Sequence, residues 1–429
     1  MSEKDERVES ASVGSGNRAD RLGWFRDQAL GMFIHWSVDS QLGSVISHSL
    51  VGASRDYRTR YFRDLPKTFL PTRFDPDEWA RLAKVAGMRY VVFTTKHHNG
   101  FCMFETATTD FSIMHTPYGR DITRAVVDAF RRWGIAIGFY FSPDDFWVLE
   151  QQGHEISRNG EAADPRQNAR LMEHNLAQLR ELLTNYGPID VIFFDGVADR
   201  LKELAWELQP EIVVTRGDLA TPEQYIPAQA DARPWEACFT LGTQWAYKPT
   251  NESYKSGTQL IQMLVETRAK GGNLLLNVGP KPDGEIPIEQ AARIQELALW
   301  NFTNQEAVYA VRPWPVLRER LTLAHEVWYV QSNAGDAVYA VVTGEPWPKG
   351  ERKVLRLESV RATERTEVEI LGQSGRVLEY RPAVDAKATW WQDDHALHVS
   401  AMHAQRLYNN NQWPNPIVVK ISYPARPST

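Results

Sequence analysis

Short apolar runs alternate with longer amphipathic stretches from about residue 21 to residue 312. The apolar runs are bounded by Gly, Pro or Asp, and most are apolar at consecutive positions. This pattern is typical of strands that are buried on both faces of a parallel sheet. The predicted strands are Met32–Trp36, Tyr90–Thr95, Ile135–Phe141, Asp190–Phe194, Ile212–Thr215 and Leu274–Val278.

Three of the stretches between these strands have helical periodicity. Pro76–Ala86 has apolar residues at spacings of three, and Asp75 before Pro76 is typical of a helix start. Arg166–Tyr186 and Ser256–Lys270 place leucines on one face. Alternating strands and helices predict parallel βαβ units. We expect a closed (β/α) barrel rather than a doubly wound sheet, because no Gly-rich dinucleotide loop follows the first strand.

After Pro313 the pattern changes to short runs of β-formers separated by Gly, Asn and Pro. Residues 313–429 are therefore predicted to form an antiparallel β-sandwich that follows, along the chain, a catalytic barrel at residues 21–312. Residues 1–20 are rich in Ser, Glu, Asp and Arg and are predicted to be a disordered N-terminal tail. The predicted sandwich strands are Glu326–Gln331, Ala337–Val342, Lys353–Leu357, Thr366–Ile370, Leu397–Ala401 and Ile417–Ser422.

The composition is that of a soluble globular protein. Forty-eight Lys and Arg against 54 Asp and Glu give a formal charge of −6. With no basic run, this balance argues against nucleic acid or a membrane as partner. The N-terminus lacks the basic start and apolar core of a secretory signal, so a cytoplasmic location is expected. Cys102 and Cys238 fit a reducing compartment, and the sequence is compatible with a homo-oligomer.

Aromatic residues are in excess, with 15 Trp, 15 Tyr and 17 Phe. Large rings fill core volume, and flat rings also stack on the C–H faces of sugars. The excess therefore keeps carbohydrate among the candidate ligands.

Polar residues just past the predicted strands are the candidates for catalysis and binding, because a (β/α) barrel carries its active site at the carboxyl ends of its strands. Histidine, tyrosine, aspartate and arginine occur there and are expected to meet at one mouth. The candidates are His35 and Trp36, His97 and His98, Tyr140, Asp195, and Arg216.

Asp195 is the sharpest candidate for a catalytic carboxylate. It ends an apolar run, and Gly196 after it allows the chain to turn. The alternative role for an Asp in this position is a helix N-cap. Acid–base chemistry needs a second carboxyl group, and Glu236 beside Trp235 is the candidate because an apolar neighbour raises a carboxyl pKa. The alternative is a surface Glu next to a buried Trp.

The adjacent His97 and His98 fit three roles: metal ligands, a proton relay, or hydrogen-bonding partners of a polyol. A hydrolytic zinc barrel more typically has two histidines separated by one residue on its first strand. Here the first strand offers only His35. The sequence therefore favours a site without a metal.

Eight segments between about residues 22 and 312 resemble, in order, the α-L-fucosidases of glycoside hydrolase family 29. Together they are specific, whereas any one alone is weak. The segments are Gly31–Trp36, Lys96–Phe101, Gly138–Ser142, Phe193–Gly196, Val214–Asp218, Trp235–Cys238, Trp245–Tyr247 and Gly271–Pro280.

The resemblance implies a (β/α) barrel with a C-terminal β-sandwich, and retaining exo-hydrolysis of α-L-fucosides in fucosylated glycans without metal or cofactor. By position, Asp195 matches the nucleophile of the family and Glu236 the acid/base of many members. Trp36 and Trp235 are expected to contribute aromatic contacts to the sugar. The residues that match fucose-binding positions are His35, His97, His98, Tyr140 and Arg216. For a retaining pair we expect Asp195 and Glu236 in one pocket, with carboxyl groups about 5–5.5 Å apart.

Several departures from the family pattern concern fine specificity. Ser37 stands where the family usually has Gly, and Phe193 stands where many members have Trp. Val38–Tyr61 lacks the expected loop with Trp and Glu. Three alternatives stay open at this point: a metal-dependent barrel hydrolase, a sugar-binding protein without activity, and an enzyme for another fucose-like sugar such as an α-galactoside.

Overall fold

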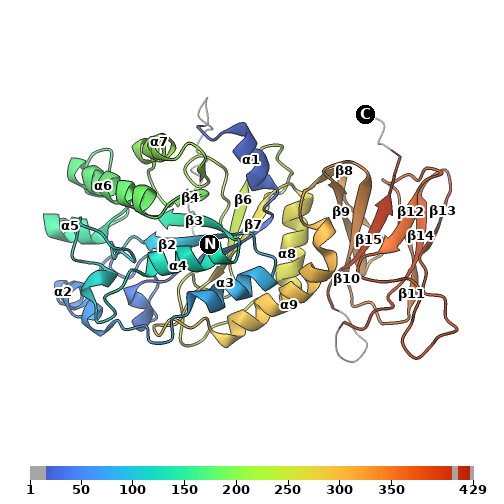
Figure 1. Cartoon of the computed structure of the whole chain (residues 1–429), viewed down its shortest axis with the longest axis horizontal. Coiled ribbons are helices and arrows are strands. Elements are labelled where there is room, and N and C mark those ends of the chain that lie inside the picture. The colour runs from blue at the N-terminus through green and yellow to red at the C-terminus, as the bar shows by residue number, and fades with distance from the viewer. Residues whose placement is uncertain (1–15, 408–413, 426–429) are drawn as a thin grey trace.

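The computed structural model describes residues 16–407 and 414–425. Figure 1 shows two parts side by side: a parallel sheet wrapped by helices, coloured from blue to yellow, and a set of antiparallel strands, coloured from brown to red. The predicted fold class, a TIM-like (β/α) barrel followed by a C-terminal β-sandwich, is confirmed, but the expected closure of the barrel is not found, because the sheet keeps two edge strands within the described residues. None of the helices in these ranges is long and apolar enough to cross a membrane.

The barrel sheet has seven parallel strands within the described residues, in the order β5-β4-β3-β2-β1-β7-β6. Six of them match predicted strands to within two residues at either end. The seventh, β6, has no counterpart among the predicted strands, because its sequence, Glu-Ala-Cys-Phe-Thr, begins and ends with polar residues and has no long apolar run. The strands are β1 Leu30–Ile34, β2 Tyr90–Lys96, β3 Ala136–Phe141, β4 Val191–Phe194, β5 Val213–Val214, β6 Glu236–Thr240 and β7 Asn273–Val278.

The sheet has two edge strands, β5 and β6, and one irregular segment runs along the edge of β6. Residues 220–224 run parallel to β6, and Glu223 pairs with Cys238. The backbone N–H of Cys238 donates to the carbonyl of Pro222 over 3.0 Å, and the N–H of Gln224 donates to the carbonyl of Cys238 over 3.0 Å. These bonds satisfy backbone groups at the edge of β6, and the segment leads the chain towards the barrel mouth.

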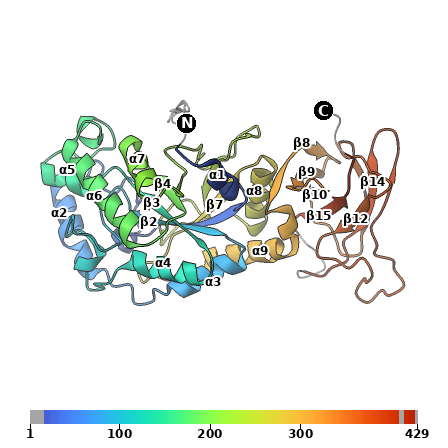
Figure 2. The same ribbon diagram turned by 45° about the horizontal axis from the view of Figure 1, so that its top comes forward.

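The helices pack on the outside of the sheet in neighbouring pairs, α3 on α4, α6 on α7 and α8 on α9 (Figures 1 and 2). Three predicted helices are confirmed as α3, α6 and α8. The side chain of Asp75 accepts the N–H groups of Asp77 and Glu78 and so caps α3, while Ser256 and Gln259 form a capping box on α8. The helices are α1 Ala19–Arg26, α2 Arg55–Arg63, α3 Pro76–Val85, α4 Ile122–Arg132, α5 Phe146–Gln152, α6 Ala169–Asn185, α7 Asp199–Leu208, α8 Gly257–Ala269 and α9 Ile288–Asn304.

The inside of the barrel is filled by side chains in layers. Along β6, alternate residues face the same side, so Glu236, Cys238 and Thr240 follow one another from the closed end to the mouth. Tyr90, Phe33 and Cys238 belong to one buried apolar cluster. Gly31 leaves room for the Tyr90 ring, since a Cβ there would lie 2.5 Å from it.

The C-terminal part has two antiparallel sheets, of order β12-β15-β10-β9-β8 and β11-β14-β13. Strands β8 and β9 pack against α8, which joins this part to the barrel. The strands are β8 Val311–Arg320, β9 His325–Ser332, β10 Ala337–Gly344, β11 Arg352–Leu357, β12 Glu367–Ile370, β13 Thr389–Gln392, β14 Leu397–Met402 and β15 Ile417–Ser422.

Two predicted boundaries shift. Residues 1–15 of the predicted tail lie outside the described residues, but α1 begins at Ala19, so the tail prediction is wrong for residues 16–20. The Asn17 side chain bonds to the backbone of Val214, which fixes this segment to the edge strand β5. The expected division at 312/313 falls inside β8, which begins at Val311.

Candidate active site

A pocket of about 450 Å³ opens at the carboxyl ends of the barrel strands. Its walls come from strand residues such as Tyr140 and Phe193 and from the segments that follow β1 to β6, which is the position expected for a barrel active site. Five of the predicted site residues line it: His35, His97, Tyr140, Asp195 and Arg216.

Asp195 lines the pocket and lies directly after β4. Its carboxylate accepts a hydrogen bond from the Tyr140 hydroxyl at 2.8 Å on Oδ2 and from Arg216 Nη1 at 3.1 Å on Oδ1. Gly196 has φ 149°, a conformation that L side chains rarely adopt, and this turn exposes one fifth of the Asp195 side chain to the pocket. Asp195 therefore lies in the pocket at the carboxyl end of a strand, and its predicted role as nucleophile stays a prediction.

The charge of Asp195 is fixed by its neighbours. Burial alone would raise its pKa, but the contact with His98 and the charges of Arg216 and Arg158 outweigh burial and lower the pKa of Asp195 well below its usual value. Asp195 is therefore an ionised carboxylate over the whole physiological range.

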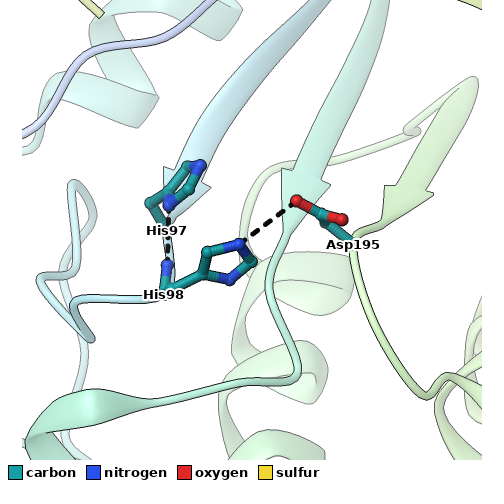
Figure 3. Close-up of side chains that lie close together, drawn as sticks. All are labelled: His97, His98 and Asp195. Carbon is teal, nitrogen blue, oxygen red and sulfur yellow. Dashed lines mark hydrogen bonds and ion pairs between the residues drawn. The ribbon is translucent and has the colours of Figure 1, made fainter. Parts of the chain in front are cut away.

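The tandem histidines turn in different directions (Figure 3). The His98 imidazole points towards Asp195, with Nε2 3.4 Å from Oδ2, and its Nδ1 lies 2.6 Å from the Ser142 hydroxyl. His97 accepts the backbone N–H of His98 on Nδ1 at 2.9 Å, and its ring stacks on Tyr140. His98 thus supports the carboxylate, while His97 lines the pocket.

His35 and His97 are neutral. Burial lowers the pKa of His35 to about 4, although the hydrogen bond to Asn277 opposes the shift. Burial also lowers the pKa of His97 well below its usual value. His35 Nδ1 lies 2.6 Å from Asn277 Oδ1, so Nδ1 carries the proton and Nε2 is left as an acceptor. Neutral imidazoles of this kind suit sugar hydroxyl groups.

His97, His98 and Asp195 lie close enough to share one metal ion, with one ligand atom of each within 4.8 Å of the others. The electrostatics oppose a cation there. Arg216 already occupies one oxygen of Asp195, and Arg158 Nη2 lies 3.9 Å from the same oxygen. A metal cation between these three residues would lie close to both guanidinium groups, and like charges repel. The arrangement therefore favours a neutral sugar over a metal.

The prediction that Glu236 shares the pocket is wrong. Glu236 is the first residue of β6, at the closed end of the barrel, and it is fully buried. Its Oε2 accepts a hydrogen bond from the Tyr90 hydroxyl at 2.5 Å. Cys238, the next inward residue on β6, lines the pocket instead. Burial raises the pKa of Glu236 to about 7. This shift results from the position of Glu236 in the core and gives no evidence for a role in the pocket.

The predicted sugar contacts of Trp36 and Trp235 are also wrong, because both indoles are core residues outside the pocket lining. Trp36 donates through Nε1 to the carbonyl of Lys281 at 3.0 Å. Trp235 packs over Gly272, where a Cβ would lie 2.4 Å from its ring. The tryptophan that lines the pocket is Trp245, whose ring packs at a tilt against His35 with ring centres 4.9 Å apart.

Glu223 is the second carboxylate of the pocket, and the sequence prediction missed it. Arg216 binds Asp195 with Nη1 and Glu223 Oε2 with Nη2, each over 3.1 Å. The indole Nε1 of Trp245 donates to Glu223 Oε1 at 3.2 Å. The Glu223 side chain is 39% exposed, so water and substrate reach it. No motif marks this glutamate in the sequence, although its place after the fifth strand fits a barrel catalytic residue.

Comparison with known proteins identifies the family. A family model described as Alpha-L-fucosidase matches residues 2–306. The tissue α-L-fucosidase of Homo sapiens is 30% identical over 82% of this chain and 81% of that protein. The α-L-fucosidase of Dictyostelium discoideum is 26% identical over 82% of this chain and 84% of that protein.

Solved structures agree. α-L-Fucosidase isoenzyme 1 from Paenibacillus thiaminolyticus has a TM-score of 0.76 at 29% identity, covering 94% of this chain and 98% of that chain. A family 29 α-L-fucosidase from Bacteroides thetaiotaomicron, trapped as a covalent intermediate with 2-fluoro-fucosyl fluoride, has a TM-score of 0.74 at 23% identity, covering 96% and 98%. This chain therefore belongs to the α-L-fucosidases of glycoside hydrolase family 29, which are retaining hydrolases of α-L-fucosides.

Proposed function

We propose that this chain releases terminal α-L-fucose from fucosylated oligosaccharides or glycoconjugates with Asp195 as nucleophile and Glu223 as acid/base. The observation that carries this assignment is that one guanidinium, that of Arg216, binds both carboxylates. Both groups therefore belong to one pocket and act on one bond. Glu236 takes no part, because it lies beneath the pocket floor.

In the first step a carboxylate oxygen of Asp195 attacks the anomeric carbon of the fucosyl group. The bond from that carbon to the aglycone oxygen breaks, and the aglycone oxygen takes the proton of Glu223. Tyr140 holds Asp195 through its 2.8 Å hydrogen bond, so the nucleophile is oriented before substrate arrives.

In the second step Glu223 takes a proton from water. The water oxygen bonds to the anomeric carbon as the bond to Asp195 breaks, so fucose leaves with retained configuration. The exposure of Glu223 gives water access to the base.

The buried cluster of Phe33, Tyr90 and Cys238 fills the barrel beneath the pocket, and neutral imidazoles and aromatic rings line part of its wall, which fits a single terminal sugar. His35 and His97 face its hydroxyl groups, while Phe193 and Trp245 offer apolar surface to the pyranose face and to the methyl group. An exo mode of hydrolysis follows, because the closed floor leaves no room for a chain on the far side of the sugar.

The experiment is a panel of nitrophenyl glycosides assayed with the wild-type chain and with Asp195→Gly. We expect release from the α-L-fucoside at least a hundredfold faster than from the α-D-galactoside, and loss of turnover in Asp195→Gly. Added azide should restore aryl release in Asp195→Gly and yield the inverted β-fucosyl azide. Equal release from the galactoside would reject the substrate, and full activity of Asp195→Gly would reject the nucleophile.

We also propose two structural units that join near residue 310. In support, α9 is followed by a short 3₁₀ turn, Gln305–Ala307, and β8 begins at Val311. We further propose a reducing compartment such as the cytoplasm, which is supported by the buried, unpaired thiols of Cys102 and Cys238.

A further inference from the structure

A second arginine reaches the nucleophile from a different part of the chain. Arg158 lies in the connection between α5 and α6, outside the segments that resemble the family. Its Nη2 is 3.9 Å from Asp195 Oδ1, the oxygen that Arg216 Nη1 already binds at 3.1 Å. Arg158 also lines the pocket. Two guanidinium groups therefore converge on one oxygen of Asp195.

Asp144 holds Arg158 in this position. Arg158 Nε donates to Asp144 Oδ2 at 2.8 Å, and Asp144 is buried in the loop after β3. Burial acts to lower the pKa of Arg158, but Asp195 and Asp144 outweigh it and raise that pKa. The guanidinium is thus charged, and its direction is fixed by a charge-assisted hydrogen bond.

The two oxygens of Asp195 have different surroundings. Oδ1 faces the two arginines, whereas Oδ2 faces the Tyr140 hydroxyl at 2.8 Å and His98 Nε2 at 3.4 Å. Arg216 also binds Glu223, so its charge is shared between both catalytic carboxylates. Asp144 shares the charge of Arg158, but it lies behind the pocket wall and is not among the residues that line the pocket. Within the pocket Arg158 therefore faces the nucleophile and not the acid/base.

We propose that Arg158 is a positioning residue whose charge stabilises the Asp195 carboxylate as it leaves the fucosyl-enzyme, and that it speeds the second step of the reaction selectively. This inference rests on the proposed function, in which Asp195 forms the covalent bond.

The selectivity follows from the direction in which charge moves. In the first step the carboxylate loses its negative charge as it bonds to the anomeric carbon, so a nearby cation stabilises the reactant more than the transition state. In the second step a water oxygen bonds to that carbon, the electron pair of the breaking bond returns to Asp195, and the water proton goes to Glu223. Negative charge grows on Asp195, so the same cation lowers this barrier.

The test uses the full chain and an activated aryl α-L-fucoside, on which the first step is fast and kcat reports the second. For Arg158→Gln we expect kcat and KM to fall together by about tenfold, with kcat/KM within about threefold of wild type. A larger burst of aryl alcohol should appear in stopped-flow traces. Arg158→Lys keeps the charge and should restore most of kcat. Arg166→Gln removes an exposed arginine of the same connection and should change neither constant.

A fall of kcat/KM as large as the fall of kcat would overturn the proposal, since it would show that Arg158 does not act selectively on the second step. A rise of KM at unchanged kcat would overturn it too, because it would make Arg158 a substrate-binding residue. Arg158→Met is measured in parallel with Arg158→Gln, because both remove the charge. The kinetic outcomes above are judged on whichever of the two keeps the melting profile of wild type. Azide rescue of Asp195→Gly is run alongside. Successful rescue without a selective effect at Arg158 rejects this inference alone, whereas failed rescue rejects the proposed nucleophile.

Discussion

Tyr90 and Glu236 form a hydrogen bond at the closed end of the barrel, with the phenol donating to the carboxylate over 2.5 Å. Tyr90 starts β2 and Glu236 starts β6, so the bond crosses the interior of the barrel below the pocket. This relationship separates a buried structural carboxyl from the two carboxylates at the mouth. It also gives the protein a pH-dependent stability that is independent of catalysis.

Glu236→Gln is expected to raise stability at pH 8 and to leave activity near wild type. Burial raises the pKa of Glu236 from 4.5 to about 7, so the folded state holds a proton that the unfolded chain has released. The stabilising contribution is complete below pH 4.5 and is lost as pH rises through 7. Gln has no titrating carboxyl group, so the variant does not lose this contribution. We expect its free energy of unfolding in denaturant to exceed that of wild type by about 1–3 kcal/mol at pH 8 and to differ little at pH 4.

Asp39 is the internal control for that experiment. Burial raises its pKa to about 7 as well, so wild type and Glu236→Gln should both lose the Asp39 part of their stability between pH 4 and pH 8. A Glu236→Gln variant that loses as much stability as wild type over this range would contradict the account of Glu236. A hundredfold loss of kcat would return Glu236 to the mechanism.

Trp235→Phe and Trp245→Phe form a matched pair. Trp235 is buried and donates to the carbonyl of Lys270, so its replacement should cost about 1–3 kcal/mol of stability with KM unchanged. Trp245 donates to Glu223 and packs at a tilt against His35, so its replacement should lower kcat/KM with a smaller stability change. Thermal unfolding and steady-state kinetics measure both effects, and exchanged phenotypes would show that the two indoles are misassigned.

Tyr140→Phe is expected to lower kcat by about 10–100-fold on an aryl fucoside. It removes the 2.8 Å hydrogen bond to Asp195, so the pKa of Asp195 rises and the acidic limb of the kcat/KM profile moves to higher pH. Tyr186→Phe is the control, because it removes a phenol–carboxylate bond to Asp121 away from the pocket. An acidic limb that stays in place in Tyr140→Phe would contradict the role of Tyr140.

Metal removal is expected to leave the activity unchanged. His97, His98 and Asp195 are the ligand set that the described residues offer near the pocket, and Arg216 binds the carboxylate of that set. Dialysis against EDTA, followed by assay with and without added Zn²⁺, tests this directly. Activity that disappears on dialysis and returns with the metal would support a metal-dependent mechanism instead.

Much of the barrel could be predicted because buried parallel strands leave continuous apolar runs, such as Val191–Phe194, in the sequence. The residues that directly follow those runs, above all Asp195 and Arg216, could be placed for the same reason. Strand β6 could not, because its sequence, Glu-Ala-Cys-Phe-Thr, starts with a charge, ends with a polar residue and has no long apolar run. Once β6 was missed, nothing in the sequence showed that Glu236 begins a strand and so faces the closed end.

Glu223 escaped prediction for a related reason. It lies in residues 220–224, which have no regular periodicity and are held by single bridges to β6. Its proposed role depends on side-chain contacts with Arg216, seven residues before it, and with Trp245, 22 residues after it, which no local sequence pattern shows. For Trp36 and Trp235 the prediction placed core residues in the pocket. A tryptophan next to a polar candidate has the same sequence pattern whether its ring faces the pocket or the core.

The assignment of Glu223 as the acid/base is tested most directly by the chemistry of Glu223→Ala in the presence of azide, with Glu236→Ala as the matched control. Glu223→Ala should lose at least a hundredfold more activity on a fucosyl oligosaccharide than on an activated aryl fucoside, because only the poor leaving group needs a proton. Azide should accelerate its turnover of the aryl fucoside and yield α-fucosyl azide with retained configuration, as identified by NMR. The same behaviour in Glu236→Ala, with Glu223→Ala fully active on the oligosaccharide, would contradict the account.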